Sequence, residues 1–256
     1  MRRVVFNQKG GVGKSTITCN LAAVSAQQGL RTLVLDLDAQ GNSTRYLLGH
    51  QADGLAVDLA GFFDQTLKFN LHPRSTAEFV VPTPFENLHL MPSSPALEEL
   101  QSKLESRYKI YKLRDALDEI ADQYDRIYID TPPALNFYTR SALIAADRCL
   151  VPFDCDDFSR RALYALLENV QEIQADHNRK LQVEGIVVNQ FQARASLPRK
   201  VVAELIAEGL PVLQPYLSST VKVKESHEQA LPMVHLDPKH RLTLEYIALH
   251  DALRGE

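Results

Sequence analysis

The 256-residue sequence has few of the features that mark secreted, metal-stapled or membrane proteins. Its three cysteines, Cys19, Cys149 and Cys155, show no C-x-x-C or other metal-ligand spacing, so they form neither a disulfide framework nor a cysteine metal site. The apolar run near the start ends at Asn7, too early for an export signal. No run is long and apolar enough to span a bilayer. We therefore expect a cytoplasmic protein with reduced, partly buried cysteines.

An excess of positive charge is also missing, because the net charge is −4. Bulk charge therefore does not indicate a nucleic-acid-binding protein. The charge is unevenly spread, however: residues 179–241 hold nine Lys or Arg against six Asp or Glu, a balance of +3, which leaves −7 for the remainder. This asymmetry permits a local basic face. The hydrophobic fraction of 45% is ordinary for a globular protein with a core.

Short β-rich apolar runs alternate with longer helical patterns. The candidate strands are Arg3–Phe6, Thr32–Asp36, Leu88–Met91, Arg126–Asp130, Cys149–Phe153, Val183–Val188 and Val212–Gln214. The candidate helices are Ser15–Gln28, Leu113–Tyr124, Ser159–Ala175, Pro198–Glu208 and Arg241–Leu253. This alternation predicts an α/β fold with a doubly wound, mostly parallel sheet and helices on both faces. Ligands of such sheets bind at the carboxyl ends of the strands.

Residues 50–85 mix helical and turn signals with three prolines, and we interpret them as a surface excursion. There is no internal repeat, low-complexity tract or domain linker. The chain is therefore expected to form one domain, residues 1–256. Because the first strand begins at residue 3, we expect no added N-terminal helix-turn-helix domain.

A glycine-rich loop lies between the first candidate strand and the first candidate helix. It reads Lys9-Gly10-Gly11-Val12-Gly13-Lys14-Ser15-Thr16. Its glycines let backbone N–H groups surround phosphate oxygens, and the following helix adds its positive N-terminal end. Lys14 supplies a charge for the β and γ phosphates, and the Ser15 hydroxyl completes the oxygen shell of Mg²⁺. The loop with its flanking strand and helix predicts an ATP and magnesium site.

The loop departs from the common pattern G-x-x-x-x-G-K-S/T, because Gln8 stands where that pattern has its first glycine. Lys9 instead precedes two glycines directly. This arrangement resembles the deviant Walker A loop of the ParA/MinD family. The resemblance implies an ATP-bound dimer in which Lys9 reaches the nucleotide of the partner subunit. With Lys14 and Asp38, Lys9 then belongs to the catalytic residues.

Acidic residues follow the second and fourth candidate strands. The segment from Asp36 to Asn42 is similar to the family's D-x-D-P-Q-G-N, with Ala39 in place of proline. The resemblance gives Asp38 the task of positioning the attacking water, while Asp36 is interpreted as a turn-capping carboxylate. Asp130 ends an apolar strand, which is a Walker B pattern, so it is expected to hold Mg²⁺ with Ser15. The segment 131–134 matches the family's switch after that Asp.

Two further resemblances lie near the carboxyl end of the chain. Asn189 ends a candidate strand, where relatives place an Asn that recognises the adenine edge. The segment 217–226 is similar to the family's I-P-x-x-V-x-L-S-E-A, with Ser218 in place of its proline and Lys224 in place of its serine. The resemblance covers residues 3–253 apart from 50–85.

The resemblance implies a slow ATPase that cycles between monomer and ATP-sandwiched dimer. The dimer would bind DNA without sequence preference, and a ParB-like or other cargo-adaptor protein would stimulate hydrolysis. The expected DNA contacts are Arg194, Arg199, Lys200, Lys222 and Lys224. Lys222 and Lys224 are two residues apart and, on an extended segment, would point to one side. The expected location is the cytoplasm, at the nucleoid, with no membrane partner.

Two alternatives stay open. A membrane-associated ATPase resembling MinD would need a basic amphipathic C-terminal helix. The chain ends in residues 249–256, which are few and not basic. A metabolic P-loop relative, such as an ATP-dependent ligase, would use Lys9 for its substrate. The sequence does not name the cargo, which can be a plasmid, a chromosome or a large protein assembly.

Overall fold

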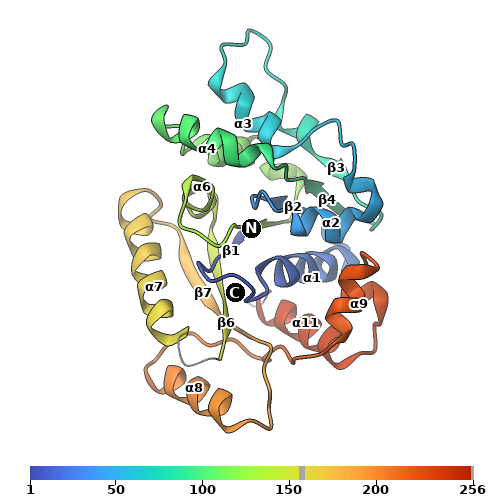
Figure 1. The fold of residues 1–256 in the computed structure, drawn as a ribbon, viewed down its shortest axis with the longest axis vertical. Helices are drawn as coiled ribbons and strands as arrows, with labels where there is room; N and C mark the ends of the chain where they lie inside the picture. Colours follow the sequence, from blue (N-terminus) through green and yellow to red (C-terminus); the bar gives the residue numbers. More distant parts are fainter. Residues whose placement is uncertain (156–158, 255–256) are drawn as a thin grey trace.

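A mostly parallel sheet with helices on both faces forms the centre of the molecule (Figure 1). The computed structural model describes residues 1–155 and 159–254. Within this part the sheet has seven strands in the order β3-β4-β2-β5-β1-β6-β7. The short edge strand β3 is antiparallel to β4, and the other neighbouring strands are parallel. The predicted doubly wound fold is confirmed.

The strand bounds agree closely with the predicted ones, except that the short strand β3 was not predicted. The strands are β1 Arg2–Val5, β2 Thr32–Asp36, β3 Val81–Pro82, β4 Leu88–Met91, β5 Arg126–Asp130, β6 Arg148–Asp154 and β7 Gln182–Asn189. The prediction of a strand at Val212–Gln214 is wrong. There the chain forms only an isolated bridge between Ile186 and Val212, and Pro215, directly after the predicted strand, has no N–H with which to continue a ladder.

Alternation along the strands divides the apolar side chains between two cores. On β2, Leu33 and Leu35 face one core and Val34 faces the other. The first core is covered by α3 Leu59–Leu67, α4 Ala96–Ser106, α5 Lys112–Glu119, α6 Phe137–Ala145, α7 Ser159–Asp176 and α8 Ser196–Ala207. The second is covered by α1 Lys14–Gln27, α2 Asn42–Leu48, α10 Met233–Leu236 and α11 Arg241–Ala252, with α9 Lys222–Glu228 beside them. Over the described ranges, three 3-10 helices complete the set: Gly49–Ala52, Thr76–Phe79 and Ala121–Gln123.

Residues 50–85 are not a surface excursion throughout, which corrects the prediction. They contain α3, whose N-cap Asp58 accepts a 2.7 Å hydrogen bond from the Gly61 N–H. The α3 residues Phe62 and Phe63 are buried, and Phe63 makes an edge contact with Phe137. The three prolines of this segment led to the prediction of irregular structure, although the apolar residues of α3 have helical spacing.

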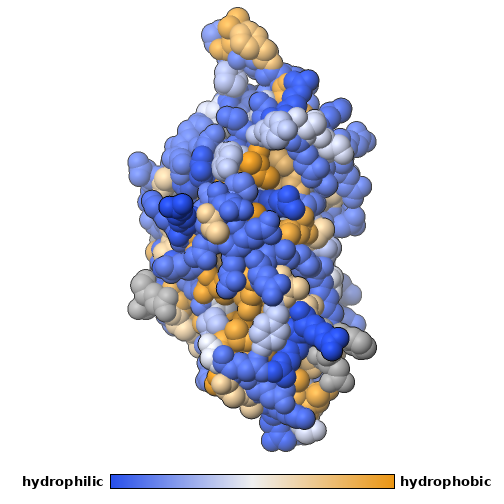
Figure 2. All heavy atoms as spheres, turned by 90° about the vertical axis from the view of Figure 1, so that its left-hand side faces the viewer, coloured by the Kyte–Doolittle hydropathy of each residue, from blue (hydrophilic) through white to orange (hydrophobic). Residues whose placement is uncertain are grey.

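The loop after α3 does fit the description of an excursion. Phe69 and Leu71 in this loop are 93% and 77% exposed. Figure 1 draws the loop projecting beyond α3, and Figure 2 shows an apolar patch at the same end of the molecule. All three cysteines are buried, more completely than the predicted partial burial. Among the described residues, no helix has both the length and the hydropathy that crossing a bilayer requires.

A buried ion pair joins the first and last strands across β6. Arg3 on β1 donates to both carboxylate oxygens of Glu184 on β7, at 2.7 Å each. The two side chains are 3% and 4% exposed. Arg3 Nη2 also donates to the Leu253 carbonyl at 2.6 Å, so the same guanidinium holds the end of α11. Breaking such a pair leaves an uncompensated buried charge.

We predict that Glu184→Ala lowers the free energy of unfolding by about 3–5 kcal/mol, because Arg3 then stays buried without its carboxylate. Urea denaturation followed by circular dichroism measures this. The matched control is Asp115→Ala, which removes an exposed pair with Lys112 and should cost less than about 1 kcal/mol. Equal losses in the two variants would contradict the structural role of the buried pair.

Candidate nucleotide site

The glycine-rich loop connects β1 to α1 in a left-handed backbone conformation. Gly11 has a φ of 76° and Gly13 a φ of 91°. A Cβ on Gly13 would lie 2.3 Å from Asn189 Nδ2, so only glycine fits there. No side chain caps the N-terminus of α1, and its first turn carries no acidic residue. Its first N–H groups are thus available to an anion, as a phosphate site requires.

Lys14 is buried at the start of α1, where it is 7% exposed. Its Nζ donates to the Lys9 carbonyl at 3.1 Å. Burial lowers the pKa of Lys14, and the charges of Asp130 and Asp38 act in the opposite direction. The ammonium group is thus held in a poorly solvated position beside two carboxylates, where an anionic ligand would offset its charge.

The two strand-end carboxylates Asp36 and Asp130 lie side by side, in register on β2 and β5. Asp36 accepts hydrogen bonds from the Thr44 N–H at 2.7 Å and the Thr44 hydroxyl at 2.8 Å, which is the turn-capping role predicted for it. Burial, followed by the charge of Asp130, raises the pKa of Asp36. Asp38 is 9% exposed, and its Oδ1 accepts from the Gln40 N–H at 3.1 Å.

Asp130 has one carboxylate oxygen in use and one without a partner. Oδ2 accepts from the Ser43 hydroxyl at 2.7 Å, while Oδ1 is buried with no hydrogen-bond partner among the described residues. Burial raises the pKa of Asp130, against the opposing effects of the Ser15 and Ser43 hydroxyls and of Lys14. A buried oxygen without a donor is a suitable ligand for a hard cation. The donor set therefore fits Mg²⁺, which would take its remaining ligands from phosphate oxygens and water.

Two cavities adjoin the loop. The phosphate cavity, of about 430 Å³, is lined by Gly10, Gly11, Gly13, Lys14, Ser15, Thr16, Asp38, Gln40, Asn42, Pro133 and His227. The base-side cavity, of about 210 Å³, is lined by Gly11, Gly13, Thr16, Asn189, Gln190, Ser218, Ser219, Thr220, Val223, Lys224, Leu242 and Tyr246. Most residues predicted for ATP thus surround one continuous region at the carboxyl ends of the strands, as the fold predicts.

Asn189 lies at the end of β7 and contacts the loop itself. Its Nδ2 donates to the Val12 carbonyl at 2.9 Å, and the next residue, Gln190, donates to the Gly11 carbonyl at 3.2 Å. Asn189 lines the base-side cavity at the position expected for adenine recognition. Its amide donor is engaged by the loop in this structure. Its contact with adenine stays a prediction.

The residues predicted to contact DNA fall into two groups. Arg194, Arg199 and Lys200 are exposed around the N-terminus of α8, and Lys200 Nζ lies 3.9 Å from Glu204. Lys222 and Lys224 lie on helix α9, not on an extended segment, which corrects the prediction. At about 100° per residue they point in nearly opposite directions. Lys222 pairs with Glu225 at 2.7 Å, and the i, i+3 spacing of this pair is compatible with the helix.

Lys224 lines the base-side cavity beside Asn189. It is also exposed, and its predicted contact with DNA stays a prediction. Sequence analysis also missed Ser43, which holds Asp130, and His227, which lines the phosphate cavity. Ser43 stands one residue after the predicted acidic segment and His227 one residue after segment 217–226. No local pattern distinguishes either residue.

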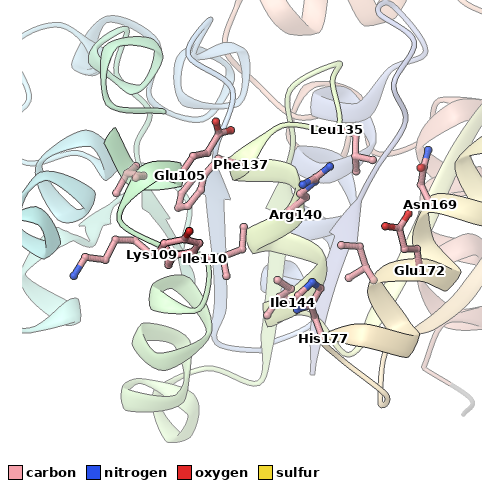
Figure 3. Close-up of a pocket in the computed structure, with 13 residues that line it drawn as sticks. Glu105, Lys109, Ile110, Leu135, Phe137, Arg140, Ile144, Asn169, Glu172 and His177 are labelled. Carbon is pink, nitrogen blue, oxygen red and sulfur yellow. The ribbon is translucent and has the colours of Figure 1, made fainter. Parts of the chain in front are cut away.

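A separate cavity of about 370 Å³ lies between the residues around α4 and α5 and helices α6 and α7 (Figure 3). Its lining combines apolar side chains such as Leu135 and Phe137 with charged ones such as Arg140 and Glu172. In Figure 3 Glu172 extends from α7 while Phe137 and Arg140 come from α6. None of the residues predicted to bind ATP, magnesium or DNA lines this cavity.

A family model described as an AAA domain matches residues 3–183. The chromosome partitioning protein ParA of Myxococcus xanthus is 32% identical over 96% of this chain and 84% of its own length. The sporulation initiation inhibitor protein Soj of Bacillus subtilis is 30% identical over 96% and 94%. This chain belongs to the ParA/Soj/MinD family of P-loop ATPases.

Solved structures agree with this membership of the ParA/Soj/MinD family. Cobyrinic acid a,c-diamide synthase from Mycobacterium smegmatis, with a bound ATP analog and magnesium, has a TM-score of 0.84 and 28% identity over 99% of this chain and 93% of that one. Apo McdA from Cyanothece has a TM-score of 0.86 at 22% identity over 99% of both chains, which shows the common fold. The synthase from Mycobacterium smegmatis was solved with an ATP analog and magnesium, and the groups around Lys14 and Asp130 in this chain fit these two ligands.

We predict that Asp130→Asn changes both the pH dependence and the magnesium dependence of stability. A carboxyl whose folded pKa is raised stabilises the fold at acidic pH, and this stabilisation is lost as pH rises above the ordinary carboxyl range. From about pH 5 to pH 8 the nucleotide-free wild type should thus lose stability, and the asparagine variant should lose on the order of 2 kcal/mol less. Urea denaturation measures both curves.

With ATP present, Mg²⁺ should raise the melting temperature of the wild type and not that of Asp130→Asn, because the amide is a poorer magnesium ligand. Glu172→Gln, at the separate cavity, is the control and should behave as the wild type in both measurements. If the wild type and Asp130→Asn showed the same change of stability with pH and the same rise of melting temperature with Mg²⁺, Asp130 would not belong to the metal site.

Proposed function

We propose that this chain is a ParA-like ATPase that binds ATP with Mg²⁺, forms an ATP-sandwiched dimer, and hydrolyses ATP slowly to ADP and phosphate while positioning or segregating a cargo. The observation that carries the proposal is that buried Lys14 and Asp38 line one cavity on the glycine-rich loop, while the buried carboxylate of Asp130 interacts with the charge of Lys14. The ParA and Soj relatives support the choice of a partitioning function among P-loop ATPases.

The proposed chemistry divides three tasks among these residues. Loop amides and Lys14 bind the phosphates, and Ser15 with Asp130 holds Mg²⁺, which offsets negative charge as the γ phosphate is transferred. Asp38 lines the same cavity and is free to orient a water molecule with its second carboxylate oxygen, because Oδ1 is engaged by Gln40. Positioning of this kind, rather than covalent chemistry, accelerates phosphoryl transfer.

Lys9 is proposed to act across the dimer. It precedes the exposed Gly10 and Gly11, so this part of the loop is accessible to a second subunit. Its N–H donates to Asn7 Oδ1 at 2.9 Å, and Asn7 in turn donates to the Pro152 carbonyl at 2.7 Å. These bonds fix the backbone from which Lys9 extends. An added cation at the γ phosphate would stabilise the charge that develops in the transition state.

We predict that Asp38→Ala binds ATP and forms a persistent dimer while hydrolysis falls on the order of 10²-fold, since the water loses its orienting carboxylate. Size-exclusion chromatography with ATP and a phosphate-release assay measure the two properties. Lys9→Ala should also hydrolyse poorly. Mixing the two variants should restore turnover, because one site of the mixed dimer then has Asp38 from one chain and Lys9 from the other. Failure at every mixing ratio would count against action across the dimer.

The proposed DNA surface is the exposed group Arg194, Arg199 and Lys200 at the start of α8, with Lys222 on α9. This part of the chain has the positive charge balance, whereas the remainder is negative. One subunit offers few charges, but a dimer doubles them, which makes DNA affinity depend on ATP. None of these elements resembles a helix that reads bases, so binding is expected to ignore sequence.

We predict that the ATP-bound Asp38→Ala dimer shifts unrelated DNA duplexes, with log affinity falling against log salt at a slope of roughly −4 to −5. Adding Arg199→Glu and Lys200→Glu should abolish the shift and leave dimerisation intact. The control pair is Arg74→Glu and Lys103→Glu, equal in charge change and located near α3 and α4, at the far end of the long axis from α8 in Figure 1. Equal losses from both pairs would mean a general charge effect instead of a surface at α8.

The proposed location is the cytoplasm, at the nucleoid, and the proposed partner is a ParB-like or other adaptor that stimulates hydrolysis and links the ATPase to its cargo.

The relative from Mycobacterium smegmatis supports a second candidate, an ATP-dependent amide synthase. The two differ in what drives turnover: an adaptor protein and DNA in the first case, a small carboxylate substrate in the second. A membrane-associated role resembling that of MinD predicts pelleting with liposomes in the presence of ATP.

A further inference from the structure

The phosphate cavity and the base-side cavity meet at the first turn of α1. Gly11, Gly13 and Thr16 line both cavities, and Thr16 is the only one of these three with a side-chain hydroxyl. A nucleotide with its phosphates on the loop and its base beside Asn189 must pass this point. Thr16 is thus placed to contact the phosphate nearest the sugar.

His227 of helix α9 holds the Thr16 side chain from outside the loop. Its Nε2 lies 2.9 Å from Thr16 Oγ1, and His227 itself lines the phosphate cavity. The imidazole stacks on the Tyr46 ring of α2, with centroids 4.0 Å apart and planes 16° apart. The Tyr46 hydroxyl is hydrogen-bonded to the Ser226 hydroxyl, and it accepts a 3.1 Å hydrogen bond from Asn20 Nδ2 of α1. Three helices therefore fix the position of the imidazole.

The direction of the His227–Thr16 hydrogen bond decides what Thr16 can offer a phosphate. If Nε2 accepts the hydroxyl proton, Thr16 presents only lone pairs to an anion. If Nε2 carries the proton and donates it, the Thr16 hydroxyl keeps its own proton for a phosphate oxygen. Burial lowers the pKa of His227, so the ring is neutral near pH 7 and both tautomers are available to it. A bound phosphate favours the second arrangement.

We propose that His227 is a positioning residue of the nucleotide site: its Nε2–H donates to Thr16 Oγ1, and the Thr16 hydroxyl in turn donates to the phosphate nearest the sugar. The inference rests on the proposed nucleotide site. It adds a residue 211 positions away in the chain from Thr16 to a site otherwise built from the loop and the strand ends. It also connects α9 to the nucleotide through two successive hydrogen bonds, with Thr16 between them.

Three substitutions of His227 separate hydrogen bonding from packing. Phe keeps a ring that can stack on Tyr46 but has no donor. Asn places its amide nitrogen near the position of Nδ1, short of Thr16, whereas the longer Gln places it near Nε2. Isothermal titration calorimetry with a non-hydrolysable ATP analogue and Mg²⁺ gives each affinity. His227→Phe and His227→Asn should bind roughly 3- to 10-fold more weakly, and His227→Gln should bind within about 2-fold of the wild type.

A double-mutant cycle tests whether His227 acts through Thr16. Thr16→Val removes the hydroxyl, so adding His227→Asn to it should cause no further loss of affinity. Additive losses, equal weakening by Gln and Asn, or wild-type affinity in both Phe and Asn would each overturn the proposal. Because Asn and Gln are both polar, this pair keeps the test intact should the Phe variant fold poorly.

Lys14→Ala separates the failure of this inference from the failure of the nucleotide site. If Lys14→Ala binds the analogue as tightly as the wild type, the nucleotide site itself is misassigned and the role of His227 falls with it. If Lys14→Ala loses binding while His227→Asn keeps the wild-type affinity, the nucleotide site stands and only the positioning role of His227 is wrong.

Discussion

The site depends on a group of charges buried at the carboxyl ends of β2, β5 and β1. Asp36 and Asp130 are adjacent in register, and Lys14 enters the same region from α1 with 7% of its surface exposed. Ionised groups are costly to bury unless they are paired or bound to a ligand. One oxygen of Asp130 has no hydrogen-bond donor in the described residues. The strand order thus creates a position that Mg²⁺ and a phosphate would complete.

The same charges explain why the neighbouring structure is polar inside. Thr44 donates twice to Asp36 and Ser43 donates to Asp130, so the start of α2 supplies donors that the strand ends need. These residues carry no chemistry of their own in the proposed reaction. They keep the two carboxylates in fixed positions, and a displacement of about 1 Å at such a site is costly for catalysis. Sites of this kind need a supporting shell as much as reactive groups.

Family membership and fold do not by themselves define the task of the protein. A partitioning ATPase and an amide synthase both align with nearly the whole chain, because the P-loop fold serves several chemistries. The exposed basic residues at α8 and the cavity between α6 and α7 lie outside the loop and the strand ends. Proteins that share a fold commonly differ in function through surfaces and sites of this kind.

The sequence by itself determined the loop, most strands and the roles expected of Lys14 and Asp130, because those signals are local: glycines between a strand and a helix, and an apolar strand ending in Asp. The apolar spacing of α3 also indicated a helix, but the nearby prolines led to the prediction of an irregular segment. Tertiary structure decided the rest. Ser43 meets Asp130 across 87 positions and His227 meets Thr16 across 211, while Lys224 turns toward the base-side cavity because its segment is a helix. Such contacts exist only once strand order and helix packing bring distant residues together, and no local pattern specifies them.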